Sequence, residues 1–140
     1  MKKISPAIVV LLGSILILPG CATFRSDLES ANNEKDLLAK RVLARWNAII
    51  KRNYDHVYDF ATPTYRKTFS KEHFFNNYAA QLRYEKAEIR EIQFKNPEKS
   101  SARVVVDVTF TTQDGQFQLT SPVVETWIKE DGEWWHVEPR

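Results

Sequence analysis

An apolar run near the amino terminus constrains this chain more than any other feature of its sequence. The run extends from Pro6 to Leu18 and follows two lysines, Lys2 and Lys3. A bilayer-spanning helix needs about 20 apolar residues, so this run is short for that purpose. Its length and its positive flank are those of a signal peptide. We therefore expect residues 1–20 to serve as a leader and the rest of the chain to fold.

The sequence Leu18-Pro19-Gly20-Cys21 closes the apolar run. A small residue before a single cysteine at this point resembles the lipobox of bacterial lipoproteins, although Pro19 replaces the small or hydroxylated residue usual there. The resemblance implies cleavage before Cys21, a diacylglyceryl group on its sulfur and an acyl chain such as palmitate on the new amine. The alternative is an ordinary secretory signal followed by a chance cysteine.

Cys21 is the only cysteine of the chain, so it has no intramolecular disulfide partner. A lone cysteine in an exported protein calls for a modification or a partner thiol. More than one acyl chain gives stable membrane anchoring, because each buried methylene contributes about 0.8 kcal/mol. Ala22 stands where the inner-membrane retention signal of enteric lipoproteins has Asp. That resemblance implies a cell-envelope protein at the periplasmic face of the outer membrane.

Charge and composition narrow the possible functions. The formal net charge of +2 falls to zero once Lys2 and Lys3 are removed with the leader. Neither a basic stripe nor arginines interleaved with aromatics is present, which argues against nucleic acid as a partner. The 12% of aromatic residues favour a substantial core or a lined cavity over disorder. The sequence predicts a lipidated tether at residues 21–33 and one domain at residues 34–140.

The hydrophobic period predicts helices in the first half of that domain. From about Glu34, apolar residues recur at three- and four-residue spacings, which predicts a long amphipathic helix. Its inward stripe comprises Leu38, Val42, Trp46, Ile49 and Ile50. Charged residues are expected over much of its remaining surface: Lys40, Arg41, Arg45, Lys51 and Arg52. Two shorter helices are expected at residues 54–61, stopped by Thr62-Pro63, and at residues 69–82, with Ser70 as N-cap.

The period then changes to two, which predicts strands. The expected strands are residues 84–94, 103–112, 117–129 and 133–137. Asp114-Gly115 and Asp131-Gly132 separate the last three, and Asp-Gly pairs favour tight hairpins. Pro122 predicts a bulge, a bend or an edge position. The predicted fold is α+β: a long N-terminal helix and two shorter helices on a curved, cone-like antiparallel sheet of about four strands.

This order of elements resembles the nuclear transport factor 2-like superfamily over roughly residues 34–138. The early part of the resemblance rests on residues 46–50 with Tyr54 and Tyr58. The late part rests on residues 125–129 followed by Asp131-Gly132-Glu133-Trp134-Trp135. The resemblance implies a conical cavity between the helix and the sheet. It leaves activity open, because that superfamily contains both enzymes and non-catalytic binding modules.

The acid–base chemistry offered by the sequence is sparse. The three histidines lack metal-site spacing, so no metal is expected. With 4 glycines, the chain lacks a phosphate-binding loop, and no cofactor is expected. Asp59 and His73 form the best candidate catalytic pair, whereas Asp107 points to the polar face of its strand. The alternative, which we favour, leaves Asp59 in solvent or as a cap and His73 packed at a helix end.

Aromatic side chains offer a candidate ligand site. Trp46, Tyr58, Tyr78 and Trp127 are expected to line a cavity for an apolar or amphipathic ligand. The alternative is that these side chains simply fill the core. Adjacent strand residues point to opposite faces, so Trp134 or Trp135 is expected on an exposed face, where a partner protein can bind.

Two functional hypotheses follow. The first is a membrane-anchored periplasmic lipoprotein whose non-catalytic domain binds a partner protein or a small apolar ligand, with homodimerisation through the open sheet as one form of it. The second is a cavity enzyme of the isomerase or dehydratase type that uses Asp59 and His73. We prefer the first, because it requires only the anchor, the tether and an aromatic surface or cavity.

Overall fold

The computed structural model describes residues 22–78, 82–112 and 114–139, with side chains from Asn32 onward except those of residues 77 and 78. Four helices precede four strands. The helices are α1 (Ala22–Ile50), α2 (Tyr54–Tyr58), α3 (Pro63–Thr68) and α4 (Lys71–Tyr78). The strands are β1 (Arg83–Phe94), β2 (Ser101–Thr111), β3 (Gln118–Glu130) and β4 (Glu133–His136). The prediction of an α+β fold with four antiparallel strands is confirmed.

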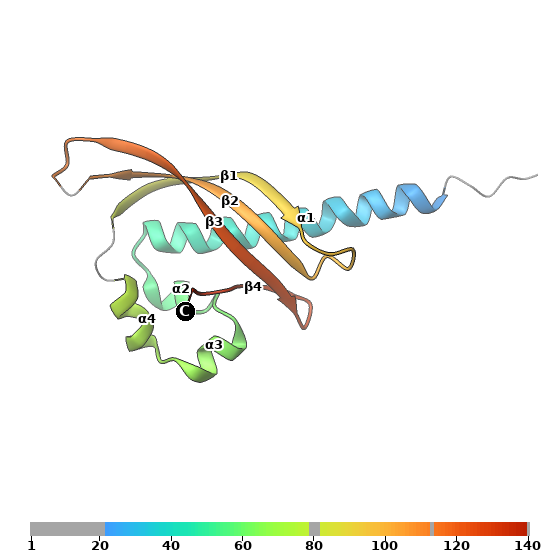
Figure 1. The fold of residues 1–140 in the computed structure, drawn as a ribbon, viewed down its shortest axis with the longest axis horizontal. Coiled ribbons are helices and arrows are strands. Elements are labelled where there is room, and N and C mark those ends of the chain that lie inside the picture. Colours follow the sequence, from blue (N-terminus) through green and yellow to red (C-terminus); the bar gives the residue numbers. More distant parts are fainter. Residues whose placement is uncertain (1–21, 79–81, 113, 140) are drawn as a thin grey trace, which may run out of the picture.

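The core lies between α1 and one face of the sheet. Leu38, Val42 and Trp46 of α1 are buried, as the hydrophobic stripe predicted. Alternate residues of β2 face them, because side chains along a strand point to opposite faces in turn. Figure 1 shows α1 running along the sheet, with α2, α3 and α4 gathered on the side of β4. The short helices therefore lie on the same side of the molecule as the last strand (Figure 1).

The sheet is an open meander in the order β1-β2-β3-β4. The β3–β4 turn has positive φ at both Asp131 (53°) and Gly132 (83°), as the predicted tight Asp-Gly turn requires. In the β2–β3 connection, Gly115 also has a positive φ of 72°. Both Asp-Gly pairs thus lie between antiparallel strands, as predicted.

Pro122 lies in the part of β3 that β4 leaves uncovered, since β4 pairs only with Trp127–Glu130. The carbonyl of Thr126 accepts a hydrogen bond from the Val137 N–H at 2.9 Å. The backbone groups of Thr126 therefore face the β4 side of β3. Backbone groups of the same parity, including those of Pro122, point to the same edge. The ring nitrogen of Pro122 therefore points to the side of β3 that has no neighbouring strand at this position, so no ladder hydrogen bond is lost. This confirms the predicted edge position.

Three short helices follow α1 instead of the two predicted. Helix α2 ends at Tyr58, before the predicted stop at Thr62-Pro63, and that pair starts α3. Thr62 caps α3, because its Oγ1 accepts a hydrogen bond from the Tyr65 N–H at 3.1 Å, and Pro63 occupies the first helical turn. Proline is well suited to that position because its φ is already helical. The predicted N-cap Ser70 is confirmed, because its Oγ accepts a hydrogen bond from the His73 N–H at 3.3 Å.

The segment before α3 also extends the sheet locally. The His136 N–H donates to the Phe60 carbonyl at 2.8 Å, and the Thr62 N–H donates to the His136 carbonyl at 3.2 Å. Ala61 thereby pairs with His136 as an isolated parallel bridge. These bonds hold the start of α3 beside the end of β4. Within the described ranges, no helix is long and apolar enough to cross a bilayer.

Truncating a core valine should be costly, whereas truncating an exposed one should not. Val106 is fully buried and Val124 is 56% exposed, and they lie on adjacent strands. We expect Val106→Ala to lower the free energy of unfolding by about 2–3 kcal/mol, through lost burial and a residual cavity. The control Val124→Ala should change it by less than about 0.5 kcal/mol. Urea unfolding measures both; equal losses would contradict the placement of the core.

Candidate functional site

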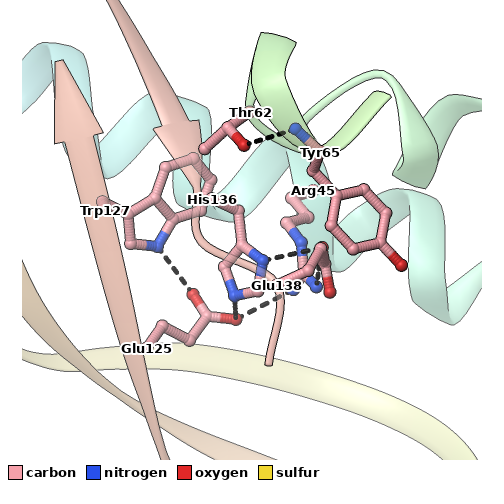
Figure 2. Close-up of polar contacts among 7 residues, drawn as sticks. All are labelled: Arg45, Thr62, Tyr65, Glu125, Trp127, His136 and Glu138. Atoms are coloured by element: carbon pink, nitrogen blue, oxygen red, sulfur yellow. Dashed lines mark hydrogen bonds and ion pairs between the residues drawn. The ribbon is translucent and has the colours of Figure 1, made fainter. Parts of the chain in front are cut away.

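Four charged or titratable side chains are buried together where α1, β3 and the chain end meet. They are Arg45 from α1, Glu125 from β3, His136 from β4 and Glu138, two residues beyond it. None is more than 7% exposed. Figure 2 shows the four side chains pointing toward one another. We call this group the buried ion network.

Arg45 bridges the two carboxylates. Its Nη1 donates to Glu125 Oε1 at 2.9 Å and its Nη2 donates to Glu138 Oε1 at 3.3 Å. On the other side, His136 Nδ1 lies 2.7 Å from Glu138 Oε1, and His136 Nε2 lies 3.8 Å from Glu125 Oε1. The indole N–H of Trp127 donates to the second oxygen of Glu125 at 2.9 Å. Each carboxylate therefore contacts both a guanidinium and an imidazole.

The sequence prediction that Arg45 lies on the outer surface of α1 is wrong. Arg45 follows Leu38 by seven residues and Val42 by three, so it lies on the same helical stripe as the core residues. Its 2% exposure confirms that placement. Glu125 likewise shares the parity of Trp127 on β3. The spacings of Arg45 and Glu125 indicate the network, because in both cases position along the element decides burial and the charge of the side chain does not.

The carboxyl group of Glu138 is held in its ionised form. Burial raises its pKa, but the hydrogen bond from His136 and the positive charges of His136 and Arg45 outweigh burial, so its pKa lies below the usual 4.5. The guanidinium of Arg45 bridges the two carboxylates, and the imidazole of His136 lies close to both. Such pairing is what makes buried charges tolerable. The network thus fastens α1 to β3 and to the chain end.

A cavity of about 350 Å³ opens beside the network, between α3 and the chain end. Its walls carry hydroxyl groups, two aromatic rings, one valine and one carboxyl group. The lining residues are Thr62, Thr64, Tyr65, Thr68, Phe69, Val137 and Glu138. Glu138 therefore belongs to both the network and the cavity. The cavity is a candidate ligand site in the described part of the chain.

The aromatic wall of the cavity is fixed by its neighbours. The rings of Tyr65 and Phe69 lie 4.8 Å apart between centroids. The Tyr58 hydroxyl donates to the Phe69 carbonyl at 2.7 Å, which anchors the end of α3. Burial, and then the negative charge of Glu138, raise the pKa of the Tyr65 phenol. The Tyr65 and Phe69 rings of the lining are thus held in place by their neighbours.

The predicted catalytic pair is not brought together in this cavity. The Asp59 side chain is 54% exposed, and its Oδ2 lies 3.7 Å from Nδ1 of His56. His73 is exposed on α4, and its ring stacks on Phe69 at 4.7 Å. Neither Asp59 nor His73 lines the cavity. Asp107 is engaged by Arg90 on the outer sheet face.

The predicted aromatic ligand site is packed in the core. Trp46 stands edge-on to Tyr84, with 5.6 Å between ring centroids, and Trp127 is fully buried. Tyr58 is buried and packs against Phe74. The Tyr78 side chain and Cys21 lie outside the described residues. These placements agree with the alternative that the aromatic side chains fill the core.

The two adjacent tryptophans of β4 do point to different surroundings. Trp134 is buried and packs against Phe94, whereas Trp135 is partly exposed. The guanidinium groups of Arg41 and Arg66 lie 5.2 and 4.9 Å from the Trp135 ring. Trp135 is therefore the tryptophan that the sequence placed on an accessible face, although two arginines flank it.

Removing the arginine of the network should leave buried carboxylates uncompensated. We expect Arg45→Met to lower the free energy of unfolding by about 3–5 kcal/mol, because breaking a buried ion pair costs far more than losing an exposed one. Lys40→Met, an exposed position of the same helix, is the control and should change it by less than about 0.5 kcal/mol. Thermal and urea unfolding report both, and similar values for the two variants would show that the network does not stabilise the fold.

The lowered pKa of Glu138 predicts an acid-sensitive contribution to stability. A carboxyl group whose folded pKa lies below its unfolded value of about 4.5 stabilises the fold above that pH. The contribution is lost as the pH falls through the folded pKa. The difference in unfolding free energy between wild type and Glu138→Gln should therefore be largest near pH 7 and shrink below about pH 4.5. A difference that stays constant with pH would contradict it; exposed Glu98→Gln is the control.

Comparisons with known proteins identify solved structures of similar fold but do not identify a family for this chain. No family model matches the chain, and no curated protein matches it. Among solved structures, a SEC-C motif containing protein from Rhodopseudomonas palustris matches with a TM-score of 0.56 and 15% identity, over 70% of this chain and 73% of that one. A SEC-C motif containing protein from Psychrobacter arcticus matches with a TM-score of 0.54 and 16% identity, over 71% of this chain and 57% of that one.

These matches correct the family resemblance drawn from the sequence. Two solved structures that share the fold are SEC-C motif containing proteins, so the assignment to the nuclear transport factor 2-like superfamily is wrong. The assignment rested on element order and on tryptophans flanking a turn. Those features are dictated by packing a helix on an antiparallel meander, which more than one family does. At such identities the likeness concerns the fold alone.

Proposed function

We propose that this chain is a lipid-anchored protein of the bacterial cell envelope whose domain binds a ligand or partner without catalysing a reaction. The acyl chains on Cys21 hold it at the membrane, on the periplasmic face of the outer membrane. The apolar leader, the lone cysteine and Ala22 support the anchor and its location. The ligand-binding part rests on the cavity beside Glu138.

The state of Glu138 is the observation that carries the non-catalytic assignment. Glu138 is the one carboxyl group among the cavity-lining residues, and its pKa is lowered despite burial by His136 and Arg45. A general base works best when its pKa lies near the working pH. A carboxylate held below its usual pKa by two cationic partners is a weak base but a good hydrogen-bond acceptor. The site is therefore suited to holding a ligand.

The distribution of aromatic residues sets the kind of ligand. Trp46 and Trp127 are buried in the core and do not line the cavity. The cavity is instead lined by residues with hydroxyl groups and by one glutamate. We propose a ligand with polar groups in place of a purely apolar one. Ligand pockets commonly combine a few such fixed polar groups with aromatic walls.

We also propose that α1 is one long helix that connects the anchor to the cone-like packing of helix and curved sheet. Helix α1 begins at Ala22, directly after the anchoring cysteine, and its core-facing residues begin at Leu38. A helix rises about 1.5 Å per residue, so the intervening turns would hold the domain off the membrane surface.

The anchor is tested by replacing its sulfur. In a Gram-negative host, the Cys21→Ser variant should move from the membrane fraction to the soluble periplasmic fraction or stay as uncleaved precursor. It should also lose incorporation of labelled palmitate, because no thiolate remains to be acylated. Ala22→Ser, the neighbouring residue, is the control and should keep both lipid and membrane association. Equal membrane association and labelling of Cys21→Ser and wild type would refute the anchor.

A further inference from the structure

We infer that the cavity between α3 and the chain end binds a small organic cation, of the primary ammonium class. This inference deepens the proposed function and rests only on its ligand-binding part, not on the lipid anchor. The juxtaposition that carries it is a buried carboxylate, three threonines and two aromatic rings around one opening of about 350 Å³.

The sign of the lining charge selects the class of ligand. Glu138 supplies the only charged side chain of the lining residues, and the lining contains no Lys, Arg or His. An anion entering this cavity would meet the carboxylate of Glu138, whose partners Arg45 and His136 contact it from the core and do not line the cavity. An ammonium group would meet an acceptor for its N–H donors, and charge-assisted hydrogen bonds are the stronger kind.

The carboxylate is held in place before any ligand arrives. In Figure 2, Glu138 lies between His136 on one side and the Tyr65 ring on the other. Arg45 and His136 contact its Oε1 from within the core. A charged group whose position is fixed by neighbours loses little freedom on binding, which favours affinity. The network therefore prepares the cavity wall as well as fastening α1.

The remaining lining residues suit an ammonium compound. The rings of Tyr65 and Phe69 offer aromatic faces, which attract cations through their quadrupoles. Thr62, Thr64 and Thr68 bring hydroxyl groups to the same opening. The raised pKa of the Tyr65 phenol, caused by burial and then by Glu138, agrees with a negative local potential. A volume near the lower end of known ligand pockets, about 300–1,000 Å³, limits the ligand to a small molecule.

The test is a calorimetric titration of the full chain, kept in detergent micelles, with cadaverine as the cationic probe. We expect saturable binding with one molecule per chain. Two probes of similar length without positive charge, 1,5-pentanediol and glutarate, should bind at least about tenfold more weakly, since only the diamine pairs with Glu138. Equal or tighter binding of the diol or of glutarate would overturn the ammonium assignment, as would no binding of cadaverine by the folded chain.

A matched pair of variants ties the binding to this cavity. Val137 lines the cavity and is 37% exposed, so Val137→Lys places a competing ammonium group at the opening. It should weaken cadaverine binding at least about tenfold. Val124→Lys adds the same charge on β3, away from the lining residues, and should leave binding unchanged. Equal binding by both variants would place the ligand elsewhere.

A third variant separates charge from shape. Glu138→Gln keeps the size of the side chain but removes its charge, and it should reduce binding if circular dichroism shows a folded domain. If the variant fails to fold, Val137→Lys and the uncharged probes still decide the question. Loss of cadaverine binding would leave the lipid anchor untouched, because palmitate labelling of Cys21 reads that part separately.

Discussion

The contact between Arg45 and its two carboxylates is the interaction on which the rest of this structure depends. It joins the first helix to Glu125 of β3 and to Glu138 beyond the last strand, segments some 80 and 93 residues away in sequence. Hydrophobic packing alone would hold α1 on the sheet, but packing is not directional. The guanidinium group has a fixed fork of donors, so it also defines how the helix and the chain end meet.

That arrangement has an energetic cost which the domain offsets locally. Burying charged groups is unfavourable, and an apolar replacement of such a network is often as stable. Here each oxygen that faces Arg45 is also approached by His136, and Trp127 satisfies the second oxygen of Glu125. One member of the network, Glu138, also lines the cavity, so an apolar replacement of the network would change the cavity wall as well. Glu138 therefore belongs both to the interactions that hold α1 in place and to the candidate site.

Much of the fold could be predicted from local signals. The strands followed from period-two patterns and Asp-Gly turns, and the stripe of α1 followed from spacing, because both depend on neighbours in sequence. Helix α3 was missed because Thr62-Pro63 was taken only as a stop, although the same pair is a good start. The cavity could not be predicted, since its walls come from α3 and from the chain end, which only tertiary packing brings together. The family resemblance failed for a related reason: element order constrains the architecture more than it identifies a family.

Pro122 affects how copies of this protein can associate through the open edge of β3. Strand β1 carries a row of charged residues, including Lys86, Glu88 and Arg90, whereas the uncovered stretch of β3 from Gln118 to Val124 carries none. A neutral open edge is the kind of surface on which strands from other copies can add and begin to aggregate. A proline in the middle of that stretch interrupts the ladder such a copy would need. The proposed lipid anchor would concentrate copies on one membrane, where the missing N–H of Pro122 limits this edge-to-edge association.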